Sequence, residues 1–194
     1  NNISALADEI YNIFGLHVDG YLSVRLEALT QIIDTFGGIK VYVPQEMDYG
    51  GSHLSQGYQT MDGAAAEFFL RTRHIYADSD LGRLRMQRYF YAALFARMRS
   101  MTVWDIAKLL PVITSQMETD LSSTELVSVA VSMLKISSSN IMFCQIPVYM
   151  GQAISYNGNS TVVVARQETA DLLNEYFREN TGPVDASQLN ICLL

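Results

Sequence analysis

Arginines and aspartates gather between residues 71 and 87, which read RTRHIYADSDLGRLRMQ. An arginine guanidinium is a planar fork that grips phosphate oxygens in pairs. A carboxylate among several arginines stays ionised and can hold a divalent cation. The segment therefore predicts an anion site, and the alternative is an exposed charged helix with weak surface ion pairs. The charged residues are Arg71, Arg73, Asp78, Asp80, Arg83 and Arg85.

The spacing within this segment predicts a helix that begins near residue 80. Arg83 and Gln87 are four residues apart, so on a helix they share one face. Asp80 fits the N-cap of a helix opened by Leu81 and Gly82. The N-terminus of a helix beside arginines favours anions, because its backbone N–H groups and its dipole point toward them.

The composition is that of an acidic globular protein. The chain has 194 residues, of which 49% are hydrophobic and 17% charged, with a net charge of −7 and a pI near 4.8. This length is sufficient for a domain with a hydrophobic core. We expect no nucleic-acid partner, since sequence-independent nucleic-acid binding needs a broad positive potential.

The cysteines and histidines show no metal-site spacing. Cys144 and Cys192 form no CxxC pair, and the three histidines are scattered, so a zinc site is not expected. Both cysteines lie in apolar runs, which favours buried thiols, although the sequence leaves a disulfide open. No apolar run has the length of a transmembrane helix, and no signal peptide is visible. The chain starts abruptly on a polar helix, so we expect that an upstream segment has been removed.

Apolar periodicity predicts alternating helices and strands around this segment. The expected helices cover residues 3–14, 27–36, 62–70, 81–99, 102–110, 122–134 and 167–179. The expected strands cover residues 21–24, 39–43, 140–148, 161–165 and 189–193, with loops at 44–60, 72–79 and 151–160. The first two strands and the helix between them predict a βαβ-like unit. The whole pattern predicts one α/β domain with helices on both faces of a sheet.

Several segments of the first half match the pattern of a known family. Residues 33–44 (IDTFGGIKVYVP) resemble V-D-x-x-G-G-(I/V)-x-V-x-V-P, and residues 69–73 (FLRTR) resemble (Y/F)-x-R-x-R. Gly57, Gly63 and Ala66 sit where the family has G-x-x-L-x-G-x-x-A, and residues 80–87 resemble D-x-G-R-x-x-R-Q. On these motifs the chain resembles the LytR-CpsA-Psr family of bacterial cell-envelope proteins. From about residue 100 onward it resembles the family only in the order of its elements.

The resemblance implies both a fold and an activity. The fold is an α/β/α sandwich with a mixed central sheet and helices on both faces. The activity is a phosphotransferase that moves an anionic glycopolymer, such as teichoic acid or capsule, from a polyprenyl-pyrophosphate carrier to peptidoglycan. The location is the extracytoplasmic face of the bacterial membrane, with attachment through an N-terminal anchor that this chain lacks.

The resemblance also implies roles for individual residues. Arg71, Arg73, Arg83 and Gln87 would bind the pyrophosphate, and Mg²⁺ would be the cofactor. Asp80 would help to hold Mg²⁺ or orient an arginine. The implied catalytic residues are Arg71, Arg73, Asp80 and Arg83.

Two departures from the family pattern keep alternatives open. The second arginine of R-x-x-R-Q falls on Met86, while Arg85 comes one position early, which on a helix turns its side chain by about 100°. The family's N-terminal strand and loop, with further acidic and basic residues, have no match. We therefore treat residues 1–194 as a single domain that lacks the family's N-terminal strands. The alternatives are a non-catalytic module that binds lipid phosphates or envelope polymers, and a structural envelope protein.

Overall fold

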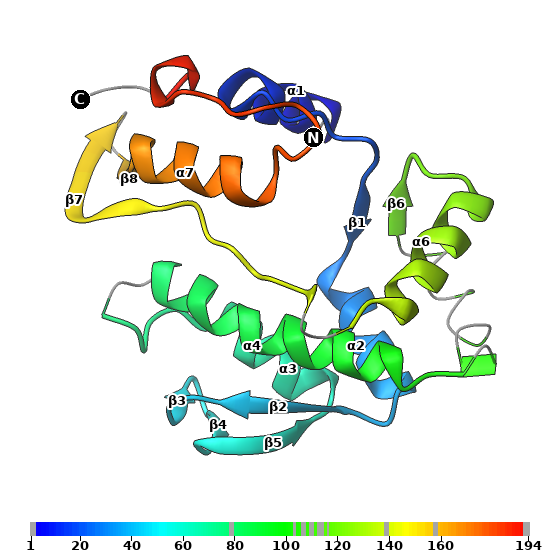
Figure 1. The fold of residues 1–194 in the computed structure, drawn as a ribbon. Helices are drawn as coiled ribbons and strands as arrows, with labels where there is room; N and C mark the ends of the chain where they lie inside the picture. Colours follow the sequence, from blue (N-terminus) through cyan, green and yellow to red (C-terminus); the bar gives the residue numbers. More distant parts are fainter. Residues whose placement is uncertain are drawn as a thin grey trace. The chain divides into compact units, whose positions relative to one another are not determined.

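The computed structural model describes residues 3–77, 80–102, 104–105, 108, 111, 115, 117–137, 140–156 and 159–191. These residues belong to two compact units (Figure 1). The larger unit is Gly20–Phe143, and the smaller combines Asn1–Asp19 with Cys144–Leu194. The arginine-rich segment lies in the larger unit.

The larger unit contains short strands and the longest described helix. Its elements are β1 (Leu22–Val24), α2 (Leu26–Thr35), β2 (Ile39–Val43), β3 (Met47–Tyr49), β4 (Ser52–Leu54), β5 (Gly57–Met61), α3 (Gly63–Arg71), α4 (Asp80–Arg99), β6 (Met117–Thr119) and α6 (Ser123–Lys135). The strands pair antiparallel, β1 with β6, β2 with β5, and β3 with β4.

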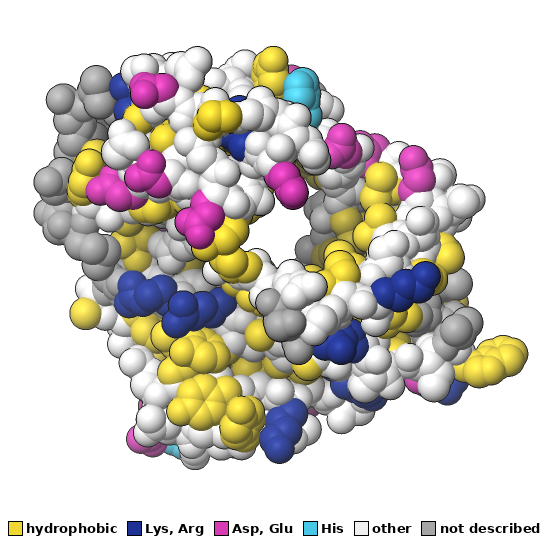
Figure 2. All heavy atoms as spheres, viewed as in Figure 1, with side chains coloured by type: hydrophobic (Ala, Val, Ile, Leu, Met, Phe, Trp, Pro, Cys, Tyr) yellow, Lys and Arg dark blue, Asp and Glu magenta, His cyan; other side chains and the backbone are white. Residues whose placement is uncertain are grey.

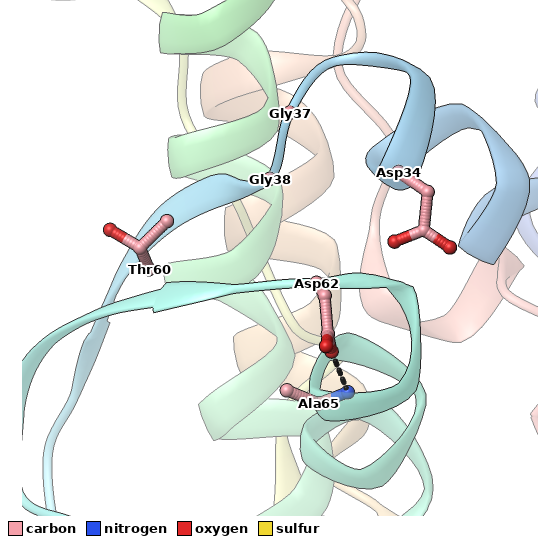
Figure 3. A pocket seen from close by; sticks show the side chains of 6 residues that line it. All are labelled: Asp34, Gly37, Gly38, Thr60, Asp62 and Ala65. Carbon is pink, nitrogen blue, oxygen red and sulfur yellow. Dashed lines mark hydrogen bonds between the residues drawn. The ribbon is translucent and has the colours of Figure 1, made fainter.

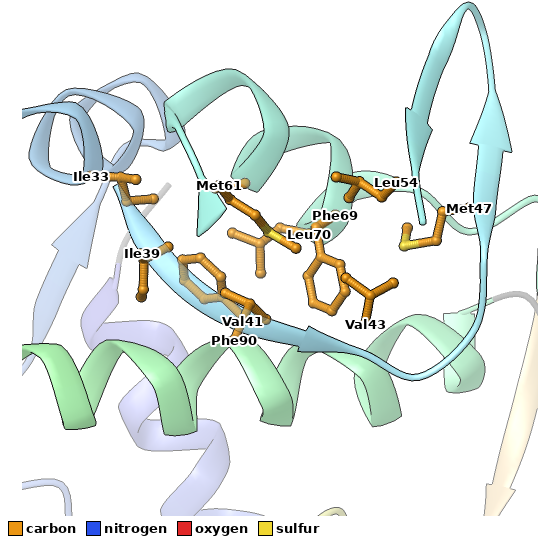
Figure 4. Packing of buried hydrophobic residues seen from close by; sticks show 11 residues of the cluster. Ile33, Ile39, Val41, Val43, Met47, Leu54, Met61, Phe69, Leu70 and Phe90 are labelled. Atoms are coloured by element: carbon orange, nitrogen blue, oxygen red, sulfur yellow. The ribbon is translucent and has the colours of Figure 1, made fainter. Parts of the chain in front are cut away.

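The core of this unit forms between β2 and the helices α3 and α4. Ile39, Val41 and Val43 alternate with exposed residues along β2, so one side of the strand is buried. Phe69 from α3 and Phe90 from α4 are fully buried in the same cluster (Figure 4). This packing fixes the two helices that carry the arginines, because burial of such side chains is the dominant favourable term in folding.

In the smaller unit, the N-terminal helix packs against the C-terminal part of the chain. Its elements are α1 (Ile3–Phe14), β7 (Val148–Tyr156), β8 (Asn159–Val164), α7 (Arg166–Tyr176) and the 3-10 helix η2 (Ala186–Gln188). Leu173 of α7 and Leu189 are buried together, and Phe14 packs against them. The Arg178 guanidinium donates a hydrogen bond of 2.5 Å to the carbonyl of Phe14, which satisfies an orphan acceptor at the end of α1.

The α/β class and most of the expected helices are confirmed. Asp62 caps α3 by accepting a hydrogen bond of 2.8 Å from the Ala65 N–H. Ser122 and Glu125 form a capping box at the start of α6, and these hydrogen bonds lower the pKa of Glu125. The helix expected at 102–110 lies largely outside the described residues.

The expected βαβ-like unit is wrong. A βαβ unit requires its two strands to run parallel in one sheet, whereas β1 pairs with β6 and β2 pairs with β5, both antiparallel. Within the described residues, the strands form four separate antiparallel pairs, of which β7 with β8 is the fourth. Among the described residues, these small pairs take the place of the central sheet that the sequence predicted.

Other local expectations are also wrong, two loops because strand pairing overrode turn signals and two strands because their residues are irregular. The expected loop at 44–60 contains β3 and β4 and most of β5, and the expected loop at 151–160 contains most of β7 and the start of β8. The expected strand at 140–148 is irregular up to 147 and mostly exposed, so Cys144 is an exposed thiol instead of a buried one. The last expected strand is irregular at 189–191, and Cys192 lies outside the described residues.

The helices α2 and α3 approach closely at Gly63. The Gly63 N–H donates a hydrogen bond of 2.7 Å to Asp34 Oδ1. A Cβ atom at residue 63 would lie 2.5 Å from the carbonyl oxygen of Thr30 and 2.8 Å from Asp34 Oδ2. Only glycine therefore fits without separating the two helices.

We expect Gly63→Ala to lower the free energy of unfolding by about 1–3 kcal/mol, because the added methyl group overpacks this contact. Urea unfolding followed by circular dichroism measures the difference. The control is Ala64→Ser at the exposed neighbouring position, which should change stability by less than about 0.5 kcal/mol. Equal stability of Gly63→Ala and the unchanged protein would show that the α2–α3 contact tolerates a side chain.

Candidate functional site

The arginine-rich segment begins at the end of α3 and continues into α4. Arg71 lies in the last turn of α3, and Asp80 lies in the first turn of α4 instead of preceding the helix as its N-cap. The side chains of Thr72 and Tyr76 are buried in the connecting segment. These two side chains anchor the connection to the core, while Arg71 and Arg73 are exposed.

Arg73, Asp80 and Arg83 come together at the start of α4. Asp80 Oδ1 lies 3.2 Å from Arg83 Nη2 and 3.8 Å from Arg73 Nη1. The Arg83 side chain is 31% exposed, and its Nε atom is buried without a hydrogen-bond partner among the described residues. One carboxylate oxygen thus faces two guanidinium groups, an arrangement that suits a phosphate oxygen equally well. Asp78 lies outside the described residues.

Arg71 and Gln87 make different contacts. Arg71 forms an i,i+4 ion pair of 2.8 Å with Glu67, and its side chain is 68% exposed. Gln87 Nε2 donates a hydrogen bond of 3.0 Å to the carbonyl of Leu70. This bond joins α4 to the last turn of α3, where carbonyls lack helical partners. The roles of Arg71 and Gln87 in pyrophosphate binding stay predictions.

The residues after Arg83 explain one departure from the family pattern. Met86, which stands where the pattern has arginine, is partly buried and packs against the main core cluster. Arg85 is exposed on α4. The one-residue offset therefore places an apolar side chain on the core-facing side of the helix and the guanidinium elsewhere.

The β3–β4 hairpin forms contacts with this segment that the sequence did not predict. The Tyr49 ring stacks on His74 with centroids 4.9 Å apart and an interplanar angle of 23°. The Tyr76 hydroxyl donates a weak hydrogen bond of 3.8 Å to Met47 Sδ. The Met-Asp-Tyr tripeptide at residues 47–49 is the sequence feature that marks this hairpin. Its side-chain contacts with residues 74–76 depend on tertiary structure.

A pocket of about 400 Å³ lies at the other end of α3 (Figure 3). Its lining residues are Asp34, Gly37, Gly38, Thr60, Asp62 and Ala65. Gly38 has a φ of +93°, and a Cβ atom there would lie 2.9 Å from the Met61 carbonyl oxygen. Gly38 therefore serves the close approach of β2 to β5. Since α3 separates this pocket from Arg71, the pocket is distinct from the arginine cluster.

Asp80 is the acidic residue of the cluster for which a metal role was expected. The part of the chain that the structure describes contains no group of three His, Cys, Asp or Glu side chains that could hold a metal ion. Mg²⁺ is, however, often held by one or two carboxylates together with substrate phosphates. The residues present therefore fit a Mg²⁺ ion only as one shared with a bound phosphate.

None of the helices that the structure describes is long and apolar enough to cross a membrane.

Comparisons with known proteins identify related sequences. The sequence model of the LytR_cpsA_psr family matches residues 3–178. The cell wall biosynthesis protein LcpA of Corynebacterium glutamicum is 26% identical over 186 residues, which cover 93% of this chain and 35% of that protein. The polyisoprenyl-teichoic acid–peptidoglycan teichoic acid transferase TagU of Oceanobacillus iheyensis is 32% identical over 114 residues, covering 58% of this chain and 36% of that protein. The chain thus spans about a third of the length of these relatives.

The fold is also that of a solved structure. The structure of the LytR-Csp2A-Psr enzyme from Actinomyces oris superposes with a TM-score of 0.69 at 19% sequence identity. The superposition covers 86% of this chain and 66% of the other. At this level of identity the similarity concerns the fold.

The buried Tyr76, in the connection between α3 and α4, makes the folding stability depend on pH. Burial raises the pKa of Tyr76, so its folded-state pKa exceeds the unfolded value near 10. The neutral ring therefore contributes stability that is fully present below about pH 10 and is lost as the pH rises through the folded-state pKa. We expect Tyr76→Phe, which cannot ionise, to lose less stability than the unchanged protein between about pH 8 and about pH 11.

Thermal unfolding at the two pH values measures this difference. Tyr58→Phe, at an exposed position, is the control and should follow the unchanged protein. If Tyr76→Phe lost stability in parallel with the other two proteins, Tyr76 would not be the group responsible.

Proposed function

Because the chain belongs to the LytR-CpsA-Psr family, we propose that it is part of a phosphotransferase of the bacterial cell envelope. Its substrate is an anionic glycopolymer linked to a polyprenyl-pyrophosphate carrier, and its acceptor is peptidoglycan. The name of the relative TagU, a transferase of teichoic acid to peptidoglycan, supports this reaction class. Since the chain spans about a third of that relative, the activity of the whole protein is part of the proposal.

The observation that carries this proposal is the placement of Arg73 and Arg83 around one carboxylate oxygen. Phosphoryl transfer needs little covalent chemistry from the protein and depends on charge neutralisation and positioning. In this reaction an acceptor hydroxyl oxygen bonds to the phosphorus that carries the polymer, the hydroxyl proton is released, and polyprenyl phosphate leaves. Arg73 and Arg83 bind oxygens of the pyrophosphate and stabilise the negative charge that develops on them.

The remaining residues position these two arginines. Asp80 holds both guanidinium groups near each other before the substrate arrives, at 3.2 Å and 3.8 Å. Arg71, in the last turn of α3, adds positive charge beside these two arginines when its ion pair with Glu67 opens. Gln87 keeps α4 against α3 through the Leu70 carbonyl and leaves its second amide N–H for the pyrophosphate.

Mg²⁺ is the proposed cofactor. Asp80 would supply its protein ligand and the pyrophosphate the others, as is common for Mg²⁺ in phosphoryl-transfer sites. When bound, the ion supplies charge neutralisation on the pyrophosphate oxygens. Hydrolysis of the pyrophosphate in the absence of an acceptor is proposed as a side activity.

The proposed location is the extracytoplasmic face of the bacterial membrane, where peptidoglycan and the lipid-linked polymer meet. The cell wall biosynthesis protein LcpA among the relatives supports an envelope location. Attachment through an N-terminal membrane anchor belongs to the same proposal.

We expect Arg83→Gln to lower the rate of polymer transfer from a polyprenyl pyrophosphate about 10²- to 10³-fold, because one charge-stabilising donor is removed. Arg83→Lys should give an intermediate rate, since it keeps the charge and loses the planar fork. Release of polyprenyl phosphate measures the reaction. The control is Arg99→Gln, at an exposed position in the last turn of the same helix. An unchanged rate for Arg83→Gln would remove the assigned role.

Removal of Mg²⁺ with EDTA should abolish transfer, and added Mg²⁺ should restore it. Asp80→Asn should raise the Mg²⁺ concentration needed for half-maximal rate, because a neutral amide is a weaker ligand than a carboxylate. Asp8→Asn, at an exposed position on α1, is the control. The same Mg²⁺ dependence in Asp80→Asn and Asp8→Asn would exclude Asp80 as a ligand.

A further inference from the structure

Three tyrosine rings form a continuous cluster on the outer side of the β2–β5 pair. Tyr42 and Tyr58 are cross-strand partners whose ring centroids lie 5.2 Å apart, with an interplanar angle of 64°. The Tyr42 ring also lies 5.9 Å from the ring of Tyr89 on α4. Tyr42 is 38% exposed and Tyr58 is 69% exposed. The inward residues of β2 already fill the core, so the exposed rings of Tyr42 and Tyr58 serve no packing need of the interior. Tyr89 is partly buried and also packs against the core cluster.

Two cations accompany the rings. Lys40 Nζ lies 5.2 Å from the centroid of the Tyr58 ring, and Arg88 Cζ lies 5.2 Å from the centroid of the Tyr89 ring. The ion pairs of the described residues include neither Lys40 nor Arg88. Figure 2 shows basic side chains beside hydrophobic ones over α4 and the β2–β5 pair. In a protein with a net charge of −7, this is a local surface of positive charge and exposed aromatic faces.

The chemistry of this surface fits a polymer that alternates rings and negative charges. A tyrosine face offers a flat, polarisable platform on which the C–H groups of a sugar ring can stack, and its hydroxyl can bond to sugar hydroxyls. Lysine and arginine bind phosphate or carboxylate groups. Side chains two residues apart on a strand, such as Lys40 and Tyr42, are separated by about 7 Å, which is comparable to one sugar unit.

We propose that Tyr42, Tyr58 and Tyr89, with Lys40 and Arg88, bind the sugar rings and charged groups of the anionic glycopolymer. This surface is called the tyrosine platform below. The inference rests on the proposed function, because it assigns the polymer portion of that substrate to a surface separate from Arg73 and Arg83. The platform holds the chain of sugars while the arginines hold its pyrophosphate end.

The binding experiment compares three soluble polymers with this chain by isothermal titration calorimetry. The probes are a hexosamine-substituted poly(ribitol phosphate), inorganic polyphosphate as a charged chain without sugar rings, and neutral dextran. The sugar phosphate polymer should bind more tightly than either of the others. Tyr58→Ala should weaken this binding about five- to tenfold through loss of one stacking face, while Tyr58→Phe should retain it.

Two further variants separate charge from stacking. Lys40→Gln should weaken binding of the sugar phosphate polymer and lower its salt dependence, because one phosphate contact is lost. Tyr176→Ala, at an exposed position on α7, is the matched control and should bind as the unchanged chain does. Equal binding of the sugar phosphate polymer and polyphosphate, or an unchanged affinity in Tyr58→Ala, would overturn the platform. Binding to phosphatidylglycerol vesicles is measured as well. If Tyr58→Ala lost vesicle binding and kept polymer binding, the surface would bind a membrane and the proposal would be overturned.

The platform and the proposed function fail separately. If the whole protein catalysed no transfer and Tyr58-dependent polymer binding remained, the transferase proposal would fail and the platform would stand. If transfer depended on Arg83 and Tyr58→Ala bound polymer normally, the platform would fail and the transferase proposal would stand.

Discussion

The close contact between α2 and α3 is the constraint on which the rest of the larger unit depends. It exists because residue 63 has no side chain, so that the Gly63 N–H reaches Asp34 and the helix backbone lies against Thr30. Gly63 begins α3, which is about 13 Å long and ends at Arg71, where the segment that leads to α4 begins. The buried Phe69 and Leu70 then hold that end in the core. Asp34 and Gly63 thus act at a distance from the arginines that they support.

The charges around Asp80 contribute little to folding. Ion pairs between half-exposed side chains contribute about 0–1 kcal/mol each, since solvent screens them. The buried Arg83 Nε, which finds no partner among the described residues, opposes folding instead. An arrangement that gains little stability and leaves a donor unused suits a site in which an incoming anion completes the hydrogen bonding. This physical asymmetry agrees with a binding role for the cluster.

Helix α4 connects the two surfaces of the larger unit. Arg83 lies near its start and Tyr89 is six residues further on, about 9 Å along the helix axis. Phe90, the next residue, is fully buried and keeps this part of the helix against β2. The same buried packing therefore sets the spacing between a cluster that suits phosphate and a platform that suits sugar rings.

The sequence by itself determined the α/β class, most helices, and the proximity of Asp80 to Arg83. These features depend on residues within one or two turns of each other, where periodicity and capping chemistry act directly. Tertiary structure alone decided the partner of each strand, the buried position of Met86, the stacking of Tyr49 on His74, and the contact of Gln87 with Leu70. It also assembled the tyrosine platform from two strands and a helix. Such contacts join residues distant in sequence, and they form only when burial of the core fixes the elements that carry them.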